Sequence, residues 1–149
     1  MATWVVDASV ILKWLLAEPE READTDQATA LMEAIARGHE SILQPPHWLG
    51  EVAAVLARLA PQTAEEDVAR LRAMDWPVAD EVEVWSRAVR IAIVSQQRVF
   101  DTLYHAVALE HGSALLVTAD ERYRQRTERV GRIVSLQAWA SGAQATSAS

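Results

Sequence analysis

Short apolar runs alternate with segments of helical periodicity along the chain, and this alternation limits the possible folds more than any other feature. The runs Thr3–Val6, Ser41–Leu43, Ala114–Val117 and Ile133–Val134 are predicted to be buried strands. Between them the apolar residues recur every three or four positions, as in the helix predicted over residues 80–95. Strands that alternate with helices predict an α/β fold, namely a three-layer α/β/α sandwich with a central, mainly parallel sheet.

The chain of 149 residues has room for one domain. Half of its residues are apolar and 23% are charged, which is typical of a globular protein. We expect a single domain over residues 1–140. The tail over residues 141–149 consists of small and polar residues and is predicted to be disordered.

Composition excludes several classes of protein. The chain has no cysteine, which excludes disulfides, thiolate nucleophiles and Cys-rich zinc sites. No apolar run approaches the roughly 20 residues that span a bilayer. The segment Met1–Asp7 lacks the basic start of a signal peptide, so we expect a cytoplasmic protein with no membrane contact.

Four acidic residues end or interrupt apolar segments. Asp7 and Asp120 directly follow predicted strands, and ligands of parallel α/β sheets bind beyond the carboxyl ends of the strands. Glu51 lies in an otherwise apolar helix that begins after Pro45-Pro46, and Asp101 opens the helix that ends at Gly112. An ionised carboxylate without a partner is costly to remove from water, so acids beside core segments point to a specific role.

Each acid also has a structural interpretation. Asp7, Asp101 and Asp120 could cap the helices that follow them, and Glu51 could pair with Arg58. If the four converge instead, their mutual repulsion requires a cation. Carboxylate oxygens are the ligands that Mg²⁺ and Mn²⁺ prefer, and the four histidines show no zinc-binding spacing. Such a site suits hydrolysis of a phosphodiester by a metal-activated water.

The four motifs in this order resemble the PIN domain, most closely the VapC-type toxins of toxin–antitoxin pairs. The resemblance covers residues 3–136. It rests on these segments: Val5-Val6-Asp7-Ala8-Ser9, Glu51 in the helix after Pro45-Pro46, Phe100-Asp101-Thr102-Leu103-Tyr104, and Leu116-Val117-Thr118-Ala119-Asp120.

The resemblance implies a Mg²⁺- or Mn²⁺-dependent endoribonuclease, an RNA substrate, inhibition by a cognate antitoxin, and a homodimer. It assigns metal binding and catalysis to the four acids and support through hydrogen bonds to two hydroxyl residues. These six residues are Asp7, Glu51, Asp101, Asp120, Ser9 and Thr118.

Other polar residues near the acids have both a functional and a structural interpretation. His47 lies four positions before Glu51, and His105 lies four after Asp101, so each shares a helix face with its acid. We expect both histidines to be packing or hydrogen-bonding residues at the rim of the site. The arginines that follow Asp120 suggest phosphate contacts at Arg122 and Arg126, although a solvated charged face explains them equally well.

Alternative functions remain open from sequence alone. The chain could be a PIN nuclease of RNA processing outside toxin–antitoxin systems, or a catalytically silent metal-binding α/β module. A haloacid-dehalogenase-like phosphatase would need a second Asp where Ser9 stands. A receiver domain would need a Lys late in the chain, but the only Lys of this sequence is Lys13.

Overall fold

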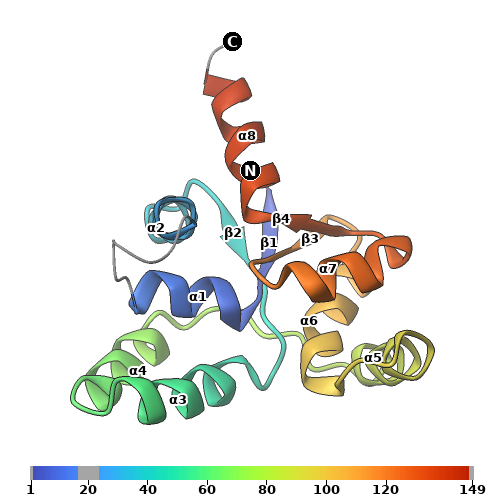
Figure 1. The fold of residues 1–149 in the computed structure, drawn as a ribbon, viewed down its shortest axis with the longest axis horizontal. Helices are drawn as coiled ribbons and strands as arrows, with labels where there is room; N and C mark the ends of the chain where they lie inside the picture. Colours follow the sequence, from blue (N-terminus) through green and yellow to red (C-terminus); the bar gives the residue numbers. More distant parts are fainter. Residues whose placement is uncertain (1, 17–23, 148–149) are drawn as a thin grey trace.

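A four-stranded parallel sheet forms the centre of the computed structural model, which describes residues 2–16 and 24–147 (Figure 1). Its strands lie in the order β2-β1-β3-β4, and every pairing is parallel. The strands are β1 (Thr3–Val6), β2 (Ser41–Ile42), β3 (Ala114–Thr118) and β4 (Ile133–Ser135).

The two central strands are apolar because both of their faces are covered. Val5 and Val6 of β1, and Leu116 and Val117 of β3, are almost fully buried. Val6 is paired with Val117, so β1 and β3 end at the same edge of the sheet. The residues that follow these two strands therefore emerge side by side.

Helices cover both faces of the sheet, and the predicted α/β/α architecture with a parallel sheet is confirmed. In Figure 1, α1 and α2 lie to one side of the sheet, and α6 and α7 lie to the other. Helix α5 packs on α6, and α4 packs on α3. The bounds are α1 (Ala8–Leu15), α2 (Thr25–Ala36), α3 (Trp48–Leu59), α4 (Ala64–Ala73), α5 (Val82–Ser95), α6 (Val99–Glu110), α7 (Glu121–Thr127) and α8 (Leu136–Ser147).

Helix α6 is the most deeply buried helix of the described chain and anchors the site. Every residue from Thr102 to Ala108 is buried, and the helix packs on β1 and β3 as well as on α5. Burial on all sides fixes this part of the helix against the sheet, and the partly exposed first turn precedes it at the edge of the sheet.

The predicted elements differ from the structure at three places. Helix α6 begins at Val99, so Asp101 lies within its first turn and does not open it. The sequence Trp76-Pro77-Val78 predicts a short edge strand, since proline is tolerated only at an edge. The structure has only one bridge there, between Gln44 and Val78, because Pro77 has no N–H for a ladder.

The third difference is the C-terminal tail. Residues 141–147 continue α8, whereas the sequence predicted disorder from Ser141. The start of α8 is held by the fully buried Leu136. Extending an existing helix adds one hydrogen bond per residue, and this segment contains no proline to stop it. Ala148 and Ser149 lie outside the described residues.

Within the described residues, none of the helices is both long enough and apolar enough to cross a lipid bilayer.

Candidate active site

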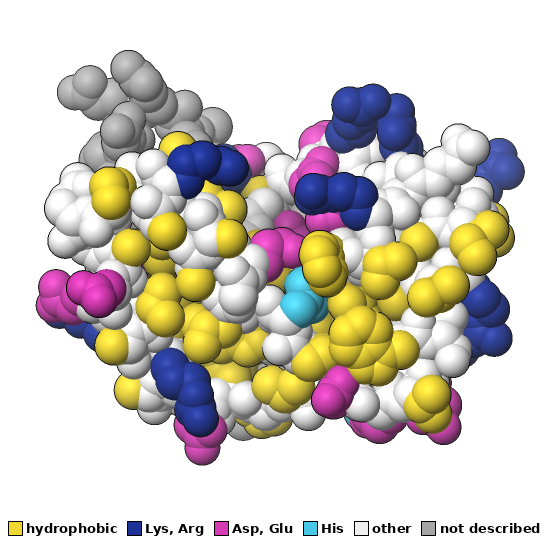
Figure 2. All heavy atoms as spheres, turned by 90° about the horizontal axis from the view of Figure 1, so that it is seen from below, with side chains coloured by type: hydrophobic (Ala, Val, Ile, Leu, Met, Phe, Trp, Pro, Cys, Tyr) yellow, Lys and Arg dark blue, Asp and Glu magenta, His cyan; other side chains and the backbone are white. Residues whose placement is uncertain are grey.

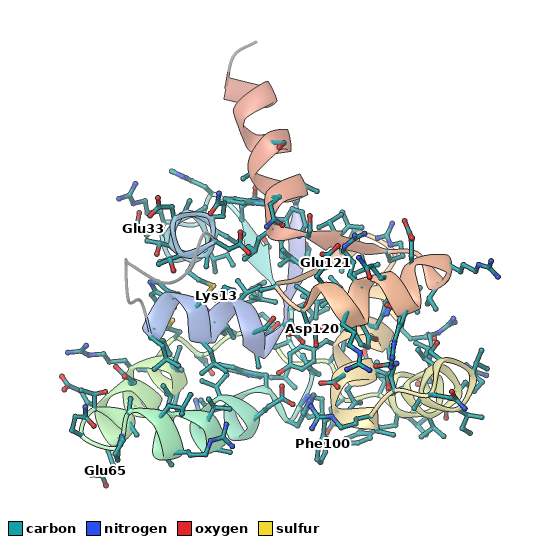
Figure 3. The ribbon with its side chains drawn as sticks, viewed as in Figure 1. Lys13, Glu33, Glu65, Phe100, Asp120 and Glu121 are labelled. Carbon is teal, nitrogen blue, oxygen red and sulfur yellow. The ribbon has the colours of Figure 1, made fainter. Side chains whose placement is uncertain are left out.

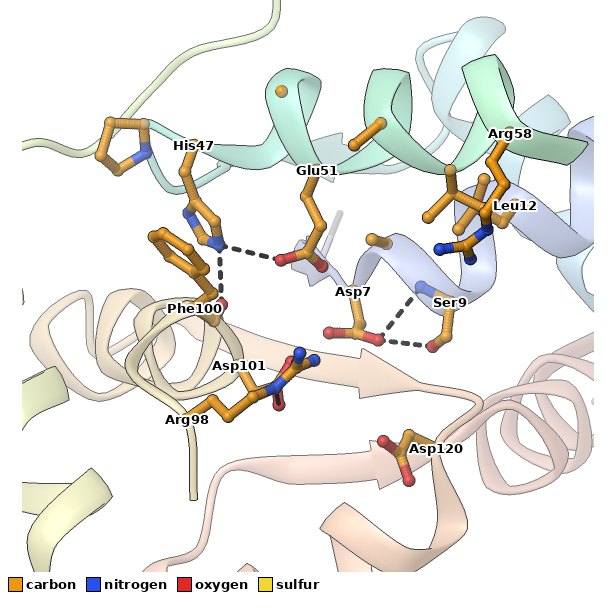
Figure 4. Close-up of a pocket in the computed structure, with 15 residues that line it drawn as sticks. Asp7, Ser9, Leu12, His47, Glu51, Arg58, Arg98, Phe100, Asp101 and Asp120 are labelled. Carbon is orange, nitrogen blue, oxygen red and sulfur yellow. Dashed lines mark hydrogen bonds and ion pairs between the residues drawn. The ribbon is translucent and has the colours of Figure 1, made fainter. Parts of the chain in front are cut away.

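A pocket of about 730 Å³ lies beyond the carboxyl ends of β1 and β3, between α1, α3 and the start of α6. Asp7, Glu51, Asp101 and Asp120 all line it, and Figure 4 shows their side chains around a common space. The structure therefore brings together the four acids that the sequence singled out. They come from four separate segments of the chain.

Asp7 is placed at the floor of the pocket by the end of β1. Its N–H donates to Val117 O (3.1 Å), which continues the pairing of β1 with β3 by one residue. Its side chain caps α1 by accepting the N–H of Ser9 (3.1 Å), and the Ser9 hydroxyl donates to the same Oδ2 oxygen. The capping interpretation and the functional one are thus compatible, since capping uses one carboxylate oxygen.

Thr118, at the end of β3, connects Asp7 to Asp120. Its hydroxyl donates to Asp7 Oδ2 (3.4 Å) and accepts the N–H of Asp120 (3.0 Å). Asp120 in turn caps α7 by accepting the N–H of Tyr123 (3.0 Å). In the whole-molecule view, Asp120 lies near the middle of the molecule and Phe100 lies below it, toward the lower edge (Figure 3).

Glu51 reaches the pocket from the first turn of α3. Tyr104, buried in α6, donates its hydroxyl to Glu51 Oε1 (3.4 Å), and His47 Nε2 lies 3.5 Å from Oε2. The pairing of Glu51 with Arg58 that the sequence left open is replaced by these two contacts. Arg58 nevertheless lines the same pocket.

Asp101 is paired with Arg98, the residue that directly precedes α6. Arg98 Nε lies 3.1 Å from Asp101 Oδ2, and Arg98 Nη2 lies 3.3 Å from Oδ1. The arginine precedes the acid by three positions, a spacing that brings side chains together on a helix. The Arg98 side chain is 79% exposed, so this ion pair lies at the open side of the pocket.

The electrostatics of the pocket are those of crowded carboxylates. Burial raises the pKa of Asp7 to about 6, and repulsion from Glu51 and Asp101 adds to the increase, while the Ser9 hydrogen bonds oppose it. Burial also raises the pKa of Tyr104, again with the negative charges of Asp7 and Glu51 contributing. Tyr104 is therefore a neutral donor to Glu51.

The donor set fits a hard divalent cation by its chemistry. All four side chains offer carboxylate oxygens, and Asp7 accepts hydrogen bonds only from neutral groups in the contacts described above. Within the described residues, however, no three acidic or histidine side chains are arranged to hold an ion as they stand. The acids would have to move toward one another to share an ion, and Arg98 already pairs with Asp101.

Three of the polar residues that the sequence placed near the acids lie away from the pocket, namely Arg122, Arg126 and His105. Arg122 and Arg126 are exposed on α7 and do not line it, so their contact with RNA stays a prediction. His105 is fully buried and not at the rim. Its Nε2 donates to Gly131 O (2.6 Å), and its Nδ1 accepts from the Tyr123 hydroxyl (3.0 Å), which is a structural role.

Sequence reasoning missed two residues of the rim. Arg98 precedes the helix that the sequence predicts to open at Asp101, so the available signal was only its spacing of three from that acid. Phe100 was read only as part of an apolar motif, whereas its side chain is 59% exposed and lines the pocket. Both lie next to Asp101 at the opening.

Two solved structures illustrate the similarity of this fold to known proteins. VapBC2 from Rickettsia felis, in a structure bound to a DNA fragment from their promoter, matches with a TM-score of 0.62 at 12% identity, over 89% of this chain and 96% of that chain. The sarcin-ricin loop cleaving toxin VapC20 from Mycobacterium tuberculosis matches with a TM-score of 0.59 at 18% identity, over 80% of this chain and 92% of that chain. At these identities the likeness establishes the fold.

No curated protein shows a significant sequence match. The family profile of the PIN domain, in contrast, matches residues 4–129. That match takes in the parallel strands β1, β2 and β3 and all four acids that line the pocket. Because it covers most of the chain, this protein belongs to the PIN-domain family.

Proposed function

We propose that this protein is a metal-dependent endoribonuclease and the toxin of a toxin–antitoxin pair. One observation carries the proposal: four carboxylates from four separate segments line a single pocket at the carboxyl edge of the parallel sheet. Carboxylates that face one pocket repel one another, and a bound cation would offset this repulsion. Membership of the PIN-domain family supports the same conclusion.

Asp7, Glu51, Asp101 and Asp120 would hold the ion, Mg²⁺ or Mn²⁺. When bound, it would supply an acidified water and positive charge beside the phosphodiester. The chain's own groups then orient the acids. Ser9 and Thr118 hold one oxygen of Asp7, and leave the other directed into the pocket.

Glu51 is oriented in a comparable way from the other wall of the pocket. Tyr104 donates to Oε1, and His47 lies beside Oε2. The buried position of Tyr104 fixes the donor, so the carboxylate keeps its direction with little loss of side-chain entropy when an ion or substrate binds.

A cognate antitoxin is the proposed protein partner. The pocket continues from the acids along an apolar wall made by Leu12, Ala54 and Val55. An antitoxin segment with apolar residues and a basic side chain directed at the acids would complement this lining. The similar fold of VapBC2 supports a partner of this kind.

A homodimer is the further assembly that we propose. Val82, Trp85, Val89 and Ile93 recur along one exposed side of α5, where Ile93 is 71% exposed. Hydrophobic side chains spread over much of the face shown in Figure 2. Exposed apolar residues that gather on one surface are characteristic of protein–protein contacts.

The test is a cleavage and toxicity assay on purified wild-type protein and on Asp101→Asn. The substitution removes one negative oxygen ligand at nearly constant volume, so cleavage of RNA in Mg²⁺ or Mn²⁺ and growth inhibition on expression should both disappear. Glu65→Gln, on an exposed acid of α4 away from the pocket, is the matched control and should keep both activities. Undiminished cleavage by Asp101→Asn would refute the assignment.

Two alternatives are separated by additional measurements. A silent module would bind Mn²⁺ in calorimetry, with a loss in Glu51→Gln, yet cleave no RNA. A PIN nuclease of RNA processing would cleave RNA without arresting growth. Co-expression of an adjacent small gene product that binds the protein and restores growth identifies the toxin.

A further inference from the structure

Phe100 is an exposed aromatic side chain at the edge of an acidic pocket, and the fold does not require it there. It lies in the first turn of α6, directly before Asp101, and lines the pocket while its side chain is 59% exposed. Its neighbours on the helix, from Thr102 onward, supply the core contacts. The exposed ring therefore suggests contact with something outside the chain.

The ring is held in place by His47 on one face. The His47 and Phe100 rings are stacked, with centroids 5.4 Å apart and an interplanar angle of 20°. His47 is fixed in turn by an edge contact with Tyr104 at 4.9 Å and by a 2.7 Å hydrogen bond between its Nε2 and Phe100 O. Because His47 covers one face of Phe100, the exposed surface of the ring includes its other face.

Arg98 provides a positive charge next to this open ring. The side of the guanidinium that carries Nε and Nη2 contacts Asp101. Within residues 2–16 and 24–147, Nη1 donates no hydrogen bond. A guanidinium carries five N–H donors in a planar fork, so it can hold a phosphate while it remains paired with the carboxylate.

We propose that Phe100 and Arg98 form a grip for one unpaired nucleotide of the substrate, with the base stacked on the open face of Phe100 and an adjacent phosphate bound by Arg98. This inference rests on the proposed ribonuclease function and names its substrate class: RNA with an unpaired base beside the cleaved bond. Aromatic side chains combined with a cation are the general means of holding single-stranded nucleic acid.

An apolar side chain of a protein partner is the other conceivable occupant of the ring. The charge of Arg98 favours the nucleotide, because an apolar side chain offers no acceptor to the guanidinium beside the ring. A nucleotide brings a flat base and a negative phosphate, which complement both residues. The grip thus lies at the open side of the pocket, beside the acids that would act on the RNA.

The experiment measures binding and not turnover. The full chain carrying Asp7→Asn, which prevents cleavage, is titrated in Mg²⁺ with a short fluorescein-labelled single-stranded RNA of randomised sequence. A ribose-phosphate oligomer of equal length without bases is the second probe. The variants are Phe100→Ala, Phe100→Tyr, Arg98→Gln and Arg98→Lys.

Two matched controls come from residues outside the pocket. Leu59→Ala removes an apolar side chain of almost the same exposure, 57%, and Arg90→Gln removes an exposed arginine of α5. Phe100 and Arg98 are exposed, so their variants should keep the thermal unfolding temperature of the parent.

Phe100→Ala should weaken binding of the RNA about 5- to 100-fold, the range for loss of one stacked base, and leave binding of the base-free oligomer unchanged. Phe100→Tyr should keep the affinity. Arg98→Gln should weaken both probes and reduce the salt dependence by about one phosphate contact, with partial recovery in Arg98→Lys.

Three results would overturn the grip. One is a Phe100→Ala affinity equal to that of Leu59→Ala, and another is an equal loss with the base-free oligomer. The third is a loss of affinity for the antitoxin alone, which would assign the ring to a protein partner. If the wild-type protein cleaves RNA and these variants bind RNA normally, only the proposed grip is refuted. If the wild-type protein cleaves no RNA, the proposed ribonuclease function is refuted.

Discussion

Arg98, which directly precedes α6, and Asp101 in the first turn of α6 form an ion pair through two contacts, 3.1 and 3.3 Å long. The negative charges of Asp101, Glu51 and Asp120 raise the pKa of Arg98, with Asp101 contributing most. The Arg98 guanidinium is thus paired with one of the acids that would hold a metal ion.

Removal of this arginine should improve divalent-ion binding. In Arg98→Gln the carboxylate of Asp101 has no arginine partner, so the metal ion no longer competes with Arg98 for it. An exposed ion pair of this kind contributes at most about 1 kcal/mol. We expect a two- to fivefold decrease, in rough terms, of the Kd for Mn²⁺ measured by calorimetry. Arg98→Lys should retain the wild-type value, and weaker binding in Arg98→Gln would show that the arginine assists the ion.

Asp7→Asn should stabilise the metal-free protein at neutral pH. The folded-state pKa of about 6 exceeds the ordinary value of 3.8, so the folded state binds the proton more strongly than the unfolded state does. Ionisation of Asp7 therefore lowers the free energy of unfolding. This loss of stability is absent below pH 3.8, develops between pH 3.8 and 6, and is complete above pH 6.

The expected gain for Asp7→Asn is about 1 to 3 kcal/mol in the free energy of unfolding at pH 7.5 in EDTA. At pH 3.5 the gain should vanish, because both forms are then neutral. Urea denaturation at the two pH values measures this difference. A variant that is less stable than the wild type at both values would show that Asp7 matters chiefly as a helix cap.

Divalent-ion binding by the wild type should weaken as the pH falls below about 6. Asp7 takes up a proton there, and a protonated carboxyl is a poor ligand for Mn²⁺. Calorimetric titrations at pH 5 and pH 7.5 should show a Kd that rises by roughly tenfold for each unit below 6. Asp7→Asn should lack this step, and an identical pH dependence in that variant would assign the titration to another acid.

Thr118→Val should destabilise the edge of the sheet. The hydroxyl is buried, donates to Asp7 and accepts the N–H of Asp120, so its loss leaves a backbone donor without that partner. The expected cost is about 1 to 2 kcal/mol in the free energy of unfolding. Thr118→Ser keeps the hydroxyl and should recover most of the stability, whereas equal losses in both variants would implicate the missing methyl group.

Ile93→Asp should dissociate the proposed homodimer. The side chain projects from α5 into an exposed apolar stripe, and a buried charge without a partner at an interface is strongly unfavourable. Sedimentation should report a dimer for the wild type and a monomer for the variant, with Glu83→Asp on the same helix as a control. A wild-type monomer at all concentrations would remove the dimer from the proposal.

Residue pattern alone was sufficient for the parallel sheet and for the candidate acids. Hydrophobic periodicity reports which positions of a segment are buried, and therefore identified β1, β3 and the helix that contains Glu51. The order of strands and helices then placed Asp7 and Asp120 at one edge, because adjacent parallel strands end together.

Tertiary packing alone decided the contacts that Glu51 and Phe100 make with distant segments. Tyr104 meets Glu51, and His47 supports Phe100, because α3 and α6 approach one another beyond the sheet. No local pattern records which side chains of two separate helices come into contact. His105 was misplaced at the rim for the same reason: its shared helix face with Asp101 says nothing about its contacts with Tyr123 and Gly131. The buried positions of a segment and the order of strands and helices along the chain can be predicted from short stretches of sequence. The electrostatic neighbours of a side chain depend instead on how distant stretches pack.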